Sequence, residues 1–470
     1  MPRRMPALAV ALAAILAAGG PAAAQNEAGL SDAWLDPNLT AASEPSAEPS
    51  APASEPVVAM APAGPRLVPW VDYSGGLESR AALTGDWKGI RQSMMNDGVR
   101  MNLNLTQTLQ GNVAGGLAHR LFYQGGMRYE VELDTEAMRM WPGGMVHVRG
   151  ETQYGETDLF DSGAILPVNT DALYPVPVEE ITCLSEAYYT QFFTPWLGAR
   201  AGKISPRSRN VFAHDETTQF FNTAFNFNPV YGLDVPLDFL AAGVVVQPCE
   251  WFNVTTYVLD AEGTANTSGF DTAFEAGTTV FQIVEFAIEP FELPGHQRAF
   301  WTWSDKSFVV LTQIPQDILP QLILTRTPVE PPPGLQTRNS DWSILYDFDQ
   351  YLYVKPDTKD EGVGLFGRFG LSDGVVNPFQ TFYSLGTGGK GIIPGRNNDT
   401  FGVGYYFLAL SNELGPVISQ PLGDEQGVEV WYNIAITPWW HLTPDIQVID
   451  PGRKVSDTAV VLGLRMRIDF

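Results

Sequence analysis

The carboxy-terminal stretch Ala459-Val-Val-Leu-Gly-Leu-Arg-Met-Arg-Ile-Asp-Phe470 alternates strictly between two kinds of side chain. In a β-strand, successive residues point to opposite faces. One face carries Val460, Leu462, Leu464, Met466, Ile468 and Phe470, and the other carries Ala459, Val461, Gly463, Arg465, Arg467 and Asp469. The first face suits lipid and the second suits water, which predicts a strand of a membrane β-barrel. A strand of a soluble β-sandwich shows the same alternation.

The amino terminus has the features of a cleavable export signal. Arg3 and Arg4 precede the apolar run 7–18, and Ala22-Ala-Ala24 supplies small residues for cleavage before Gln25. Beyond this signal, no apolar run approaches the roughly 18 to 20 residues that a membrane-spanning helix requires. An exported chain with many alternating segments and no such helix favours an outer-membrane β-barrel over a soluble sandwich.

Charge and cysteine usage narrow the range of partners. The formal net charge of -25 at pH 7 argues against nucleic acid, because long-range repulsion opposes its binding. The two cysteines, Cys183 and Cys249, lie in an exported chain, where a disulfide is possible. Cys183 precedes the predicted strand 184–193, which ends at the turn Thr194-Pro195, and Cys249 lies in the turn 247–249. If both turns lie at the same barrel rim, the two thiols are about 25 Å apart, one membrane thickness, and are expected to be free.

Composition divides the chain into four segments. Residues 1–24 form the expected signal peptide, and residues 25–76 form a periplasmic spacer rich in Ala, Pro, Ser and Glu that is expected to be disordered. Residues 77–98 are expected to form a plug-like helical segment, and residues 99–470 the β-barrel. The helix is predicted from Asp86 to Asn96, with Trp87, Ile90 and Met94 on one face and Gly98 as its stop.

The predicted strands carry charges on one face, as where Arg128 and Glu130 alternate with Tyr129 and Val131. Short connections at 194–196, 248–251 and 437–440 contain Pro followed by Trp, which places indoles where headgroups meet hydrocarbon. The long connections 260–278 and 385–399 are expected to be extracellular loops. About 16 to 18 candidate strands follow residue 99, and antiparallel closure favours an even number. The fold class is therefore all-β, an antiparallel transmembrane β-barrel, and we predict 16 strands around an aqueous channel.

Several motifs resemble those of the carbohydrate-selective porin family known as OprB. They are Leu83-Thr-Gly-Asp-Trp-Lys-Gly-Ile-Arg91 with Gly98-Val99, Ala201-Gly202-Lys203, Thr437-Pro438-Trp439 with Leu442-Thr-Pro-Asp-Ile-Gln447, Asp450-Pro-Gly452 and the final Gly463-Leu-Arg-Met-Arg-Ile-Asp-Phe470. The resemblance covers the chain from about Leu83 to its end. It implies a 16-stranded channel in the bacterial outer membrane that passes small carbohydrates, monosaccharides such as glucose, into the periplasm by passive diffusion.

The resemblance also implies that a short amino-terminal helical segment lies at or in the lumen and narrows it. The residues that it places at this constriction are Asp86, Trp87, Lys88 and Arg91. Lys88 departs from the family, which more usually has a second glycine after Gly-Asp-Trp. This lysine adds a cation near the expected constriction.

A sugar gives up water in a narrow pore, so the pore wall must supply replacement hydrogen bonds. Arginine donates as a fork, and carboxylates accept from adjacent hydroxyls. Strand parity directs these polar candidates to the lumen: Arg100, Arg128, Arg149, Arg200, Arg368, Arg465, Glu130, Glu151, Glu429, Asp445 and Gln447. A solvated wall of ion pairs is the alternative interpretation for each of them.

Aromatic rings complement the apolar C–H faces of sugars, and three aromatic residues have inward parity. These are Trp431, Tyr406 and Tyr188. Trp431 is the strongest candidate, because an indole that faces the lumen between Glu429 and Asn433 has no role toward lipid.

Two other functions remain open from the sequence. A general porin, or one that prefers anions or organic acids, would suit the many inward arginines. An outer-membrane barrel enzyme would need a catalytic constellation such as Ser-His-Asp, and we expect no enzyme, no catalytic residues, no cofactor and no metal site. The expected partners are small sugars, outer-membrane lipids and lipopolysaccharide, and the expected assembly is a monomer or a homotrimer.

Overall fold

The computed structural model describes residues 67–156, 161–175, 180–313, 335–356 and 358–470. The expected signal peptide, and the expected spacer as far as residue 66, lie outside these described residues. Within the described part of the chain, both Cys183 and Cys249 are free thiols, as the sequence predicted.

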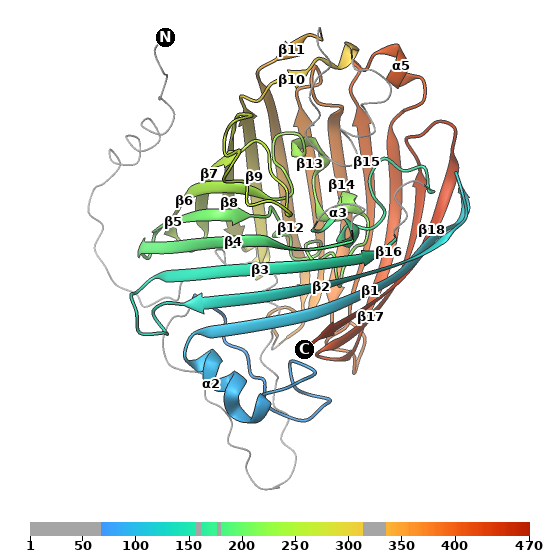
Figure 1. The fold of residues 1–470 in the computed structure, drawn as a ribbon. Helices are drawn as coiled ribbons and strands as arrows, with labels where there is room; N and C mark the ends of the chain where they lie inside the picture. Colours follow the sequence, from blue (N-terminus) through green and yellow to red (C-terminus); the bar gives the residue numbers. More distant parts are fainter. Residues whose placement is uncertain (1–66, 157–160, 176–179, 314–334, 357) are drawn as a thin grey trace, which may run out of the picture.

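Sixteen antiparallel strands of the described residues close into a barrel, in which β1 pairs with β18 (Figure 1). This result confirms the predicted fold and strand number. The barrel strands are β1 (Val99–Gly116), β2 (Leu121–Asp134), β3 (Gly144–Gly155), β4 (Ile181–Thr194), β5 (Leu197–Ile204), β6 (Phe239–Cys249), β7 (Phe252–Asp260), β8 (Thr278–Ile288), β9 (Gly295–Ser304), β12 (Asp341–Val354), β13 (Gly362–Ser372), β14 (Phe379–Lys390), β15 (Thr400–Leu410), β16 (Glu425–Thr437), β17 (Trp440–Asp450) and β18 (Asp457–Asp469). The short strands β10 (Phe308–Val309) and β11 (Thr337–Arg338) form a separate two-stranded sheet.

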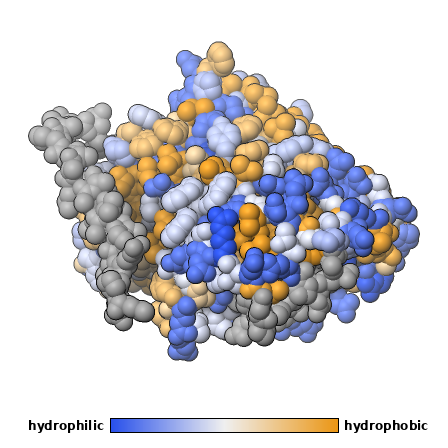
Figure 2. Space-filling view, turned by 90° about the horizontal axis from the view of Figure 1, so that it is seen from above, coloured by the Kyte–Doolittle hydropathy of each residue, from blue (hydrophilic) through white to orange (hydrophobic). Residues whose placement is uncertain are grey.

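The alternation in the last strand has the predicted orientation. Ala459 and Val461 of β18 are fully buried, whereas Leu462 and Leu464 lie exposed on the outer surface. The register also follows the pleat, because Leu464 pairs with Leu109 of β1. Seen from the end that carries β10, β11 and the short helix α5 (Pro416–Ser419), hydrophilic residues cover much of the centre and right of the molecule (Figure 2).

Aromatic residues gather at the rim that holds the short connections. Trp196 and Trp251 are exposed there, and Phe291, in the turn between β8 and β9, is 94% exposed. Trp439 instead is buried, and its indole N–H donates to the Leu77 carbonyl at 2.7 Å. Such a belt of rings is typical of the interface between hydrocarbon and headgroups.

One loop assignment was wrong. β14 continues to Lys390, so residues 391–399 form a turn at the same rim as the 437–440 turn, and not an extracellular loop. Two bonds join these turns: Asp399 accepts from the Ala435 backbone N–H at 3.0 Å, and Arg396 donates to the Ala435 carbonyl at 3.3 Å. The glycine-rich sequence 385–390 continues the strand, because each of its residues pairs with β13 and with β15.

The amino-terminal segment packs at the barrel end where the C-terminus lies (Figure 1). It contains the 3-10 turn η3 (Trp87–Gly89) and the helix α2 (Ile90–Asn96), and the Leu83 N–H donates to the Asp469 carbonyl at 2.8 Å. The predicted apolar face is wrong, since Trp87 is 40% and Ile90 59% exposed. The buried side of α2 consists of Arg91, Gln92 and Met95.

Residues 67–73, which composition placed in the spacer, are also part of this packing. Leu67, Val68, Val71 and Tyr73 are buried, and the Leu67 N–H donates to Asp134 at the end of β2. The folded part therefore begins earlier than residue 77.

Lys88 adopts a left-handed conformation with φ 62° and ψ 40°. Only glycine adopts this region without steric cost. The glycine that the related family more usually has at this position fits this turn, and Lys88 occupies it under strain.

Two extracellular connections fold back into the barrel and decide where its lumen is open. The first joins β3 to β4 and contains η4 (Asp171–Leu173). The second joins β5 to β6 and contains the helix α3 (Thr223–Asn226) and η5 (Pro229–Tyr231). We call residues 161–174 the first inserted segment and residues 205–238 the second inserted segment. Figure 1 shows α3 inside the ring of strands.

Candidate functional site

The second inserted segment is tied to the wall formed by β13, β16 and β18. Arg465 of β18 donates to the carbonyls of Glu216 and Gln219 at 2.6 and 2.5 Å, and its guanidinium lies 3.7 Å from the centroid of the Phe221 ring. Arg368 of β13 donates to the carbonyls of Ala213 and Phe225. Because these bonds satisfy main-chain carbonyls that have left water, they fix the segment in one position.

Carboxylates of β16 hold the two inserted segments by their backbone N–H groups. Glu429 accepts from Phe221 and Asn222 at 2.5 and 2.9 Å. Glu425 accepts from Ile165 and Leu166 of the first inserted segment. These acids face the lumen, as predicted, but protein backbone covers them.

The aromatic residues on this side of the barrel lie beneath the second inserted segment. Trp431 is 2% exposed, and its ring meets the Phe220 ring edge-to-face at 5.5 Å. Tyr406 is 1% exposed, packs edge-to-face on Phe225 and donates its hydroxyl to Glu425 at 3.0 Å. Both rings point inward, yet neither offers a face to a sugar. We therefore do not assign Trp431 or Tyr406 to the sugar path.

An open cavity remains on the opposite side of the lumen, between the second inserted segment and β4 to β9 with β12 and β13. It encloses about 1160 Å³, part of which is open to solvent. Aromatic, aliphatic and charged side chains together line it. The apolar ones are Tyr188, Ile204, Phe227, Tyr231, Phe239, Tyr257, Phe281, Ile283, Phe300 and Leu345, and the charged ones are Glu186, Arg200, Arg207, Arg209, Arg298, Asp347 and Arg368.

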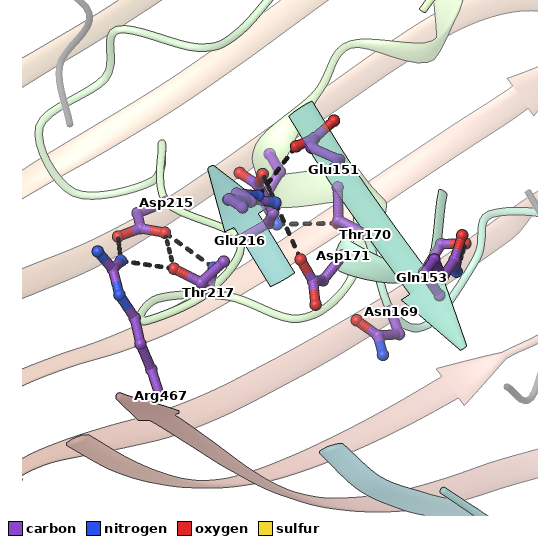
Figure 3. A network of polar contacts seen from close by, with 12 residues as sticks. Glu151, Gln153, Asn169, Thr170, Asp171, Asp215, Glu216, Thr217 and Arg467 are labelled. Atoms are coloured by element: carbon purple, nitrogen blue, oxygen red, sulfur yellow. Dashed lines mark hydrogen bonds and ion pairs between the residues drawn. The ribbon is translucent and has the colours of Figure 1, made fainter. Parts of the chain in front are cut away.

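A first ionic network joins the inserted segments to β2, β3 and β4. Arg128 of β2 binds Glu151, Asp171 and Glu216 at 3.0, 2.9 and 2.6 Å. Arg207 of the second inserted segment binds Glu151 at 3.1 Å and also Glu216. Figure 3 shows Glu151, Asp171 and Glu216 converging from three separate parts of the chain.

The same network continues along the strands. Arg149 of β3 binds Glu130 and Glu186, and Glu186 lines the cavity. Arg100 of β1 lies 3.4 Å from Glu132. The network thus runs from the cavity toward β1, with each arginine shared between strands.

A second ionic network lies across the cavity on β8, β9, β12 and β13. Arg298 binds Glu285, Asp347 and Asp349 at 2.7, 2.8 and 2.7 Å. Arg368 binds Asp347 at 2.9 Å, and Arg209 of the second inserted segment approaches Glu285 at 3.4 Å. Because the Arg209 side chain keeps 23% of its surface exposed, it is the most accessible cation of this network.

Burial and ion pairing shift two acids of the inserted segments in opposite directions. Burial raises the pKa of Asp171 to about 6, despite the opposing effect of Arg128, and Glu216 adds to the rise. Burial would also raise the pKa of Asp215, but Arg467 at 3.0 Å outweighs it and holds that pKa well below its usual range. Asp215 and Arg467, together with Thr217, appear at one side of Figure 3.

The predicted site residues therefore fall into three groups. Those at or beside the open cavity are Tyr188, Arg200, Arg368, Arg128, Arg149, Glu130 and Glu151. Those covered by the inserted segments are Trp431, Tyr406, Arg465, Glu429, Asp445 and Gln447. Those near the rim are Asp86, Trp87, Lys88, Arg91 and Arg100.

Sequence reasoning missed several residues of the cavity. Arg207 and Arg209 lie in a connection, where strand parity gives no direction. Glu285 and Arg298 lie on β8 and β9 and pair directly across the strands. Their inward parity and opposite charge were a usable signal in the sequence.

Comparison with known proteins assigns the family. A model of the family described as "Carbohydrate-selective porin, OprB family" matches residues 118–470, which is most of the chain. The chain belongs to the OprB family of carbohydrate-selective porins. As an OprB-family protein with a closed barrel of porin type, it is a sugar channel of the bacterial outer membrane.

Solved structures support the same fold. The high-pH structure of Pseudomonas putida OprB is 18% identical, with a TM-score of 0.71 over 84% of this chain and 100% of that one. The low-pH structure of the same protein is 15% identical, with a TM-score of 0.53 over 84% of this chain and 99% of that one. Among curated proteins, no match was found.

No helix in the part of the chain that the structure describes is both long and apolar enough to cross a membrane. The same residues contain no group of three or more His, Cys, Asp or Glu side chains arranged to hold a metal ion.

Proposed function

We propose that this OprB-family channel lets small neutral sugars diffuse passively along the open cavity, whose wall carries both aromatic and charged side chains. The observation that carries this proposal is the cavity itself, where rings such as Phe300 lie next to fully paired charges such as Arg298 and Asp347. Sugars carry the same two kinds of surface, because their apolar C–H faces are surrounded by a rim of hydroxyls. Outer-membrane lipids, including lipopolysaccharide, are the proposed surroundings of the apolar outer surface.

The balance of charges supports a neutral substrate over an anion. In the second ionic network, the three arginines Arg209, Arg298 and Arg368 face the three carboxylates of Glu285, Asp347 and Asp349. In the first network, the acids outnumber the arginines. Its arginines are Arg100, Arg128, Arg149 and Arg207, and its acids are Glu130, Glu132, Glu151, Asp171, Glu186 and Glu216. Neither ionic network therefore carries a net positive charge that would favour organic acids.

The paired charges also explain how a sugar can pass without being trapped. A hydroxyl that leaves water exchanges one set of hydrogen bonds for another, and the net gain per bond is about 0.5–1.5 kcal/mol. Arg298 and Asp347 already satisfy each other at 2.8 Å, so they lend only spare donors and acceptors to the sugar. Binding of this kind is strong enough for entry and weak enough for release.

Arg209 is the most informative residue for a test of this proposal. We expect glucose to inhibit the ion current of the reconstituted channel, and Arg209→Gln to raise the half-inhibiting concentration about fivefold, because exchange of a charged donor for a neutral one costs about 1 kcal/mol. Lys355→Gln is the control, because Lys355 pairs with Glu361 at the rim. If glucose neither inhibits the current nor swells proteoliposomes, while chloride passes freely, the proposal is wrong.

We also propose that the channel performs no catalytic step. The family and the fold are those of a channel. The sequence Gly370-Leu-Ser-Asp-Gly374 has the Gly-x-Ser-x-Gly pattern of hydrolases, but in those enzymes the serine sits on a turn between a strand and a helix. Here Ser372 ends β13, β14 follows, and the serine hydroxyl donates to the Phe379 carbonyl at 2.6 Å.

A further inference from the structure

The start of the amino-terminal helical segment exposes two large apolar side chains. Trp87 is 40% exposed and Ile90 59%, and Lys88 between them is exposed as well. We call these three residues the α2 face. Trp87 and Lys88 both have left-handed backbones, with φ of 53° and 62°, which carry a steric cost in residues other than glycine. Lys88 also forms no ion pair with the described residues. Exposed apolar area beside a lysine held in a strained position indicates a partner for this face.

The opposite side of α2 faces the lumen. Met95 is buried in one cluster with Val71 of segment 67–73 and with Tyr188, which lines the open cavity. The Arg91 guanidinium lies 3.8 Å from the centroid of the Tyr73 ring and 5.1 Å from that of Trp87. Arg91 thus holds the inner side of the Trp87 indole. The exposed part of the α2 face therefore points away from the lumen.

This segment fills a seam in the barrel wall. The ladder between β1 and β18 ends where Asn104 pairs with Asp469, so residues 99–103 of β1 extend past the last strand. The Leu83 N–H donates to the Asp469 carbonyl at 2.8 Å, and Arg91 donates to the Met101 carbonyl at 2.8 Å. Figure 1 shows α2 beside the start of β1, at the end of the barrel where the C-terminus lies. Residues 83–91 therefore continue the wall where β18 stops.

The two ends of α2 lie at different levels of the wall. Its start is bonded to Met101, whose side chain is exposed on the outer surface, whereas its last residue Asn96 precedes Val99, the first residue of β1. Because β1 enters the membrane from this rim, the start of α2 lies on the membrane side of its end. The polarity of the exposed residues follows the same direction. The α2 face lies at the start, and the exposed residues nearer the end are Ser93, Asn96 and Asp97.

The α2 face completes a belt of exposed apolar side chains around this rim. Such side chains lie at or beside each of the seven connections here: Trp141, Trp196, Trp251, Phe291, Tyr353, Ile393 and Ile436. The seam between β18 and β1 has no turn of its own to carry one. The α2 face occupies that place in the belt, which is continuous with the surface that meets lipid.

We propose that α2 is an interfacial helix, with Trp87 and Ile90 inserted among the phospholipids of the periplasmic leaflet and Lys88 bound to a lipid phosphate. Indole rings favour the level of the headgroups, apolar side chains leave water there, and a neighbouring lysine reaches the phosphates. A phosphate partner also explains a lysine at a position where glycine carries less strain. Lipid contact would hold residues 83–91 against the edge of β1 that β18 leaves free.

The test measures the depth of position 90 in the full chain, reconstituted in vesicles that contain phosphatidylglycerol. Ile90→Cys is made in a Cys183→Ser, Cys249→Ser background and carries a nitroxide. Collisions of this nitroxide with oxygen, which concentrates in lipid, are compared with collisions with a water-soluble nickel chelate. We expect the oxygen-to-nickel ratio to be about fivefold higher at position 90 than at Asp97→Cys, because interfacial helices bury their apolar side roughly 5–10 Å deep. Leu464→Cys, on the outer surface of β18, gives the value for lipid and reports that the barrel is folded.

Lys88→Gln in the labelled protein tests the phosphate contact. It should lower the ratio at position 90 about twofold, because a lysine near an anionic membrane surface contributes about 1 kcal/mol. The matched control is Lys355→Gln at the same rim, where Lys355 is already paired with Glu361, and it should change nothing. An unchanged ratio in Lys88→Gln overturns the phosphate contact.

Two results at position 90 overturn the interfacial helix itself. In the first, the ratio equals that of Asp97→Cys while Leu464→Cys reads lipid, so that the α2 face lies in water. In the second, neither reagent reaches the nitroxide, so that protein covers the face. If Ile90→Cys gives no folded barrel, Trp87→Cys supports the same comparison, because Trp87 is also exposed.

Discussion

The two sides of the lumen have the same strand pattern but different contents. On the side of β13 to β18, inward residues such as Trp431 and Glu429 contact the second inserted segment. On the side of β4 to β9, inward residues such as Phe300 and Arg298 border an open cavity. We call these the covered side and the open side. Inward orientation is therefore necessary for contact with substrate but does not establish it.

The difference arises from what the inserted segments need. A connection that enters a barrel takes its backbone N–H and carbonyl groups out of water, and each must find a partner. Arg465 and Glu429 supply those partners on the covered side. The same residue types that suit sugar hydroxyls thus serve the protein's own backbone.

Removal of one such anchor is expected to change the covered side more than any other variant described below. Arg465→Met keeps the length of the side chain but leaves the carbonyls of Glu216 and Gln219 unsatisfied. We expect a loss of roughly 2–5 kcal/mol in the attachment of the second inserted segment. The segment should then leave the covered side, and single-channel conductance should rise several-fold as glucose inhibition weakens.

Arg396→Met is the control for this experiment. Arg396 pairs with Asp399 in the rim turn, far from the inserted segments in the fold, and its loss should leave conductance unchanged. An Arg465→Met channel with normal conductance and normal glucose inhibition would show that the covered side is stable without this anchor.

The sequence predicted the barrel more fully than its contents. The alternation on β18 and the Pro-Trp turns depend only on neighbouring residues and on a membrane of known thickness. A short stretch of sequence is therefore enough to predict them. The inserted segments depend on contacts such as that between Glu429 and Phe221, which are 208 residues apart. No local pattern marks such a contact, and Trp431 was therefore assigned to the water-filled lumen.

The amino-terminal helix shows a second limit of local patterns. Trp87, Ile90 and Met94 have helical spacing, which predicts an apolar buried face, yet Arg91, Gln92 and Met95 are the buried residues. Gln92 bonds the backbone of Tyr73 and Val71, so segment 67–73 selects the polar side of α2. This segment was assigned to the spacer because its neighbours are rich in Ala, Pro and Ser.

A change of pH is expected to give a smaller effect, on the first inserted segment. Because burial raises the pKa of Asp171 to about 6, its stabilising contribution is complete below the unfolded pKa of about 3.9 and is lost as pH rises through about 6. The loss is on the order of 3 kcal/mol. We expect lower amide protection factors, which correct exchange for the base-catalysed intrinsic rate, in residues 161–174 at pH 7.5 than at pH 4.5.

Asp171→Asn isolates this contribution, since an amide of the same shape does not titrate. The variant should reduce the difference between the protection factors of residues 161–174 at the two pH values. The protection factors of the strands should stay the same. Equal pH dependence in the variant and the unmodified protein would assign the effect to other buried acids, such as Asp238, whose pKa burial raises to about 8.

The smallest expected effect on sugar binding comes from Trp431, although its sequence context made it the leading aromatic candidate. Trp431→Phe replaces the indole that packs on Phe220 with a smaller ring and leaves a small cavity. We expect the free energy of unfolding to fall by about 1–2 kcal/mol, seen as a lower unfolding temperature in detergent. The half-inhibiting concentration of glucose should change less than about twofold. Arg209→Gln, on the open side, should shift this concentration in the same assay. A shift in Trp431→Phe as large as that in Arg209→Gln would mean that the covered side opens to substrate, and the distinction between the two sides would then fail.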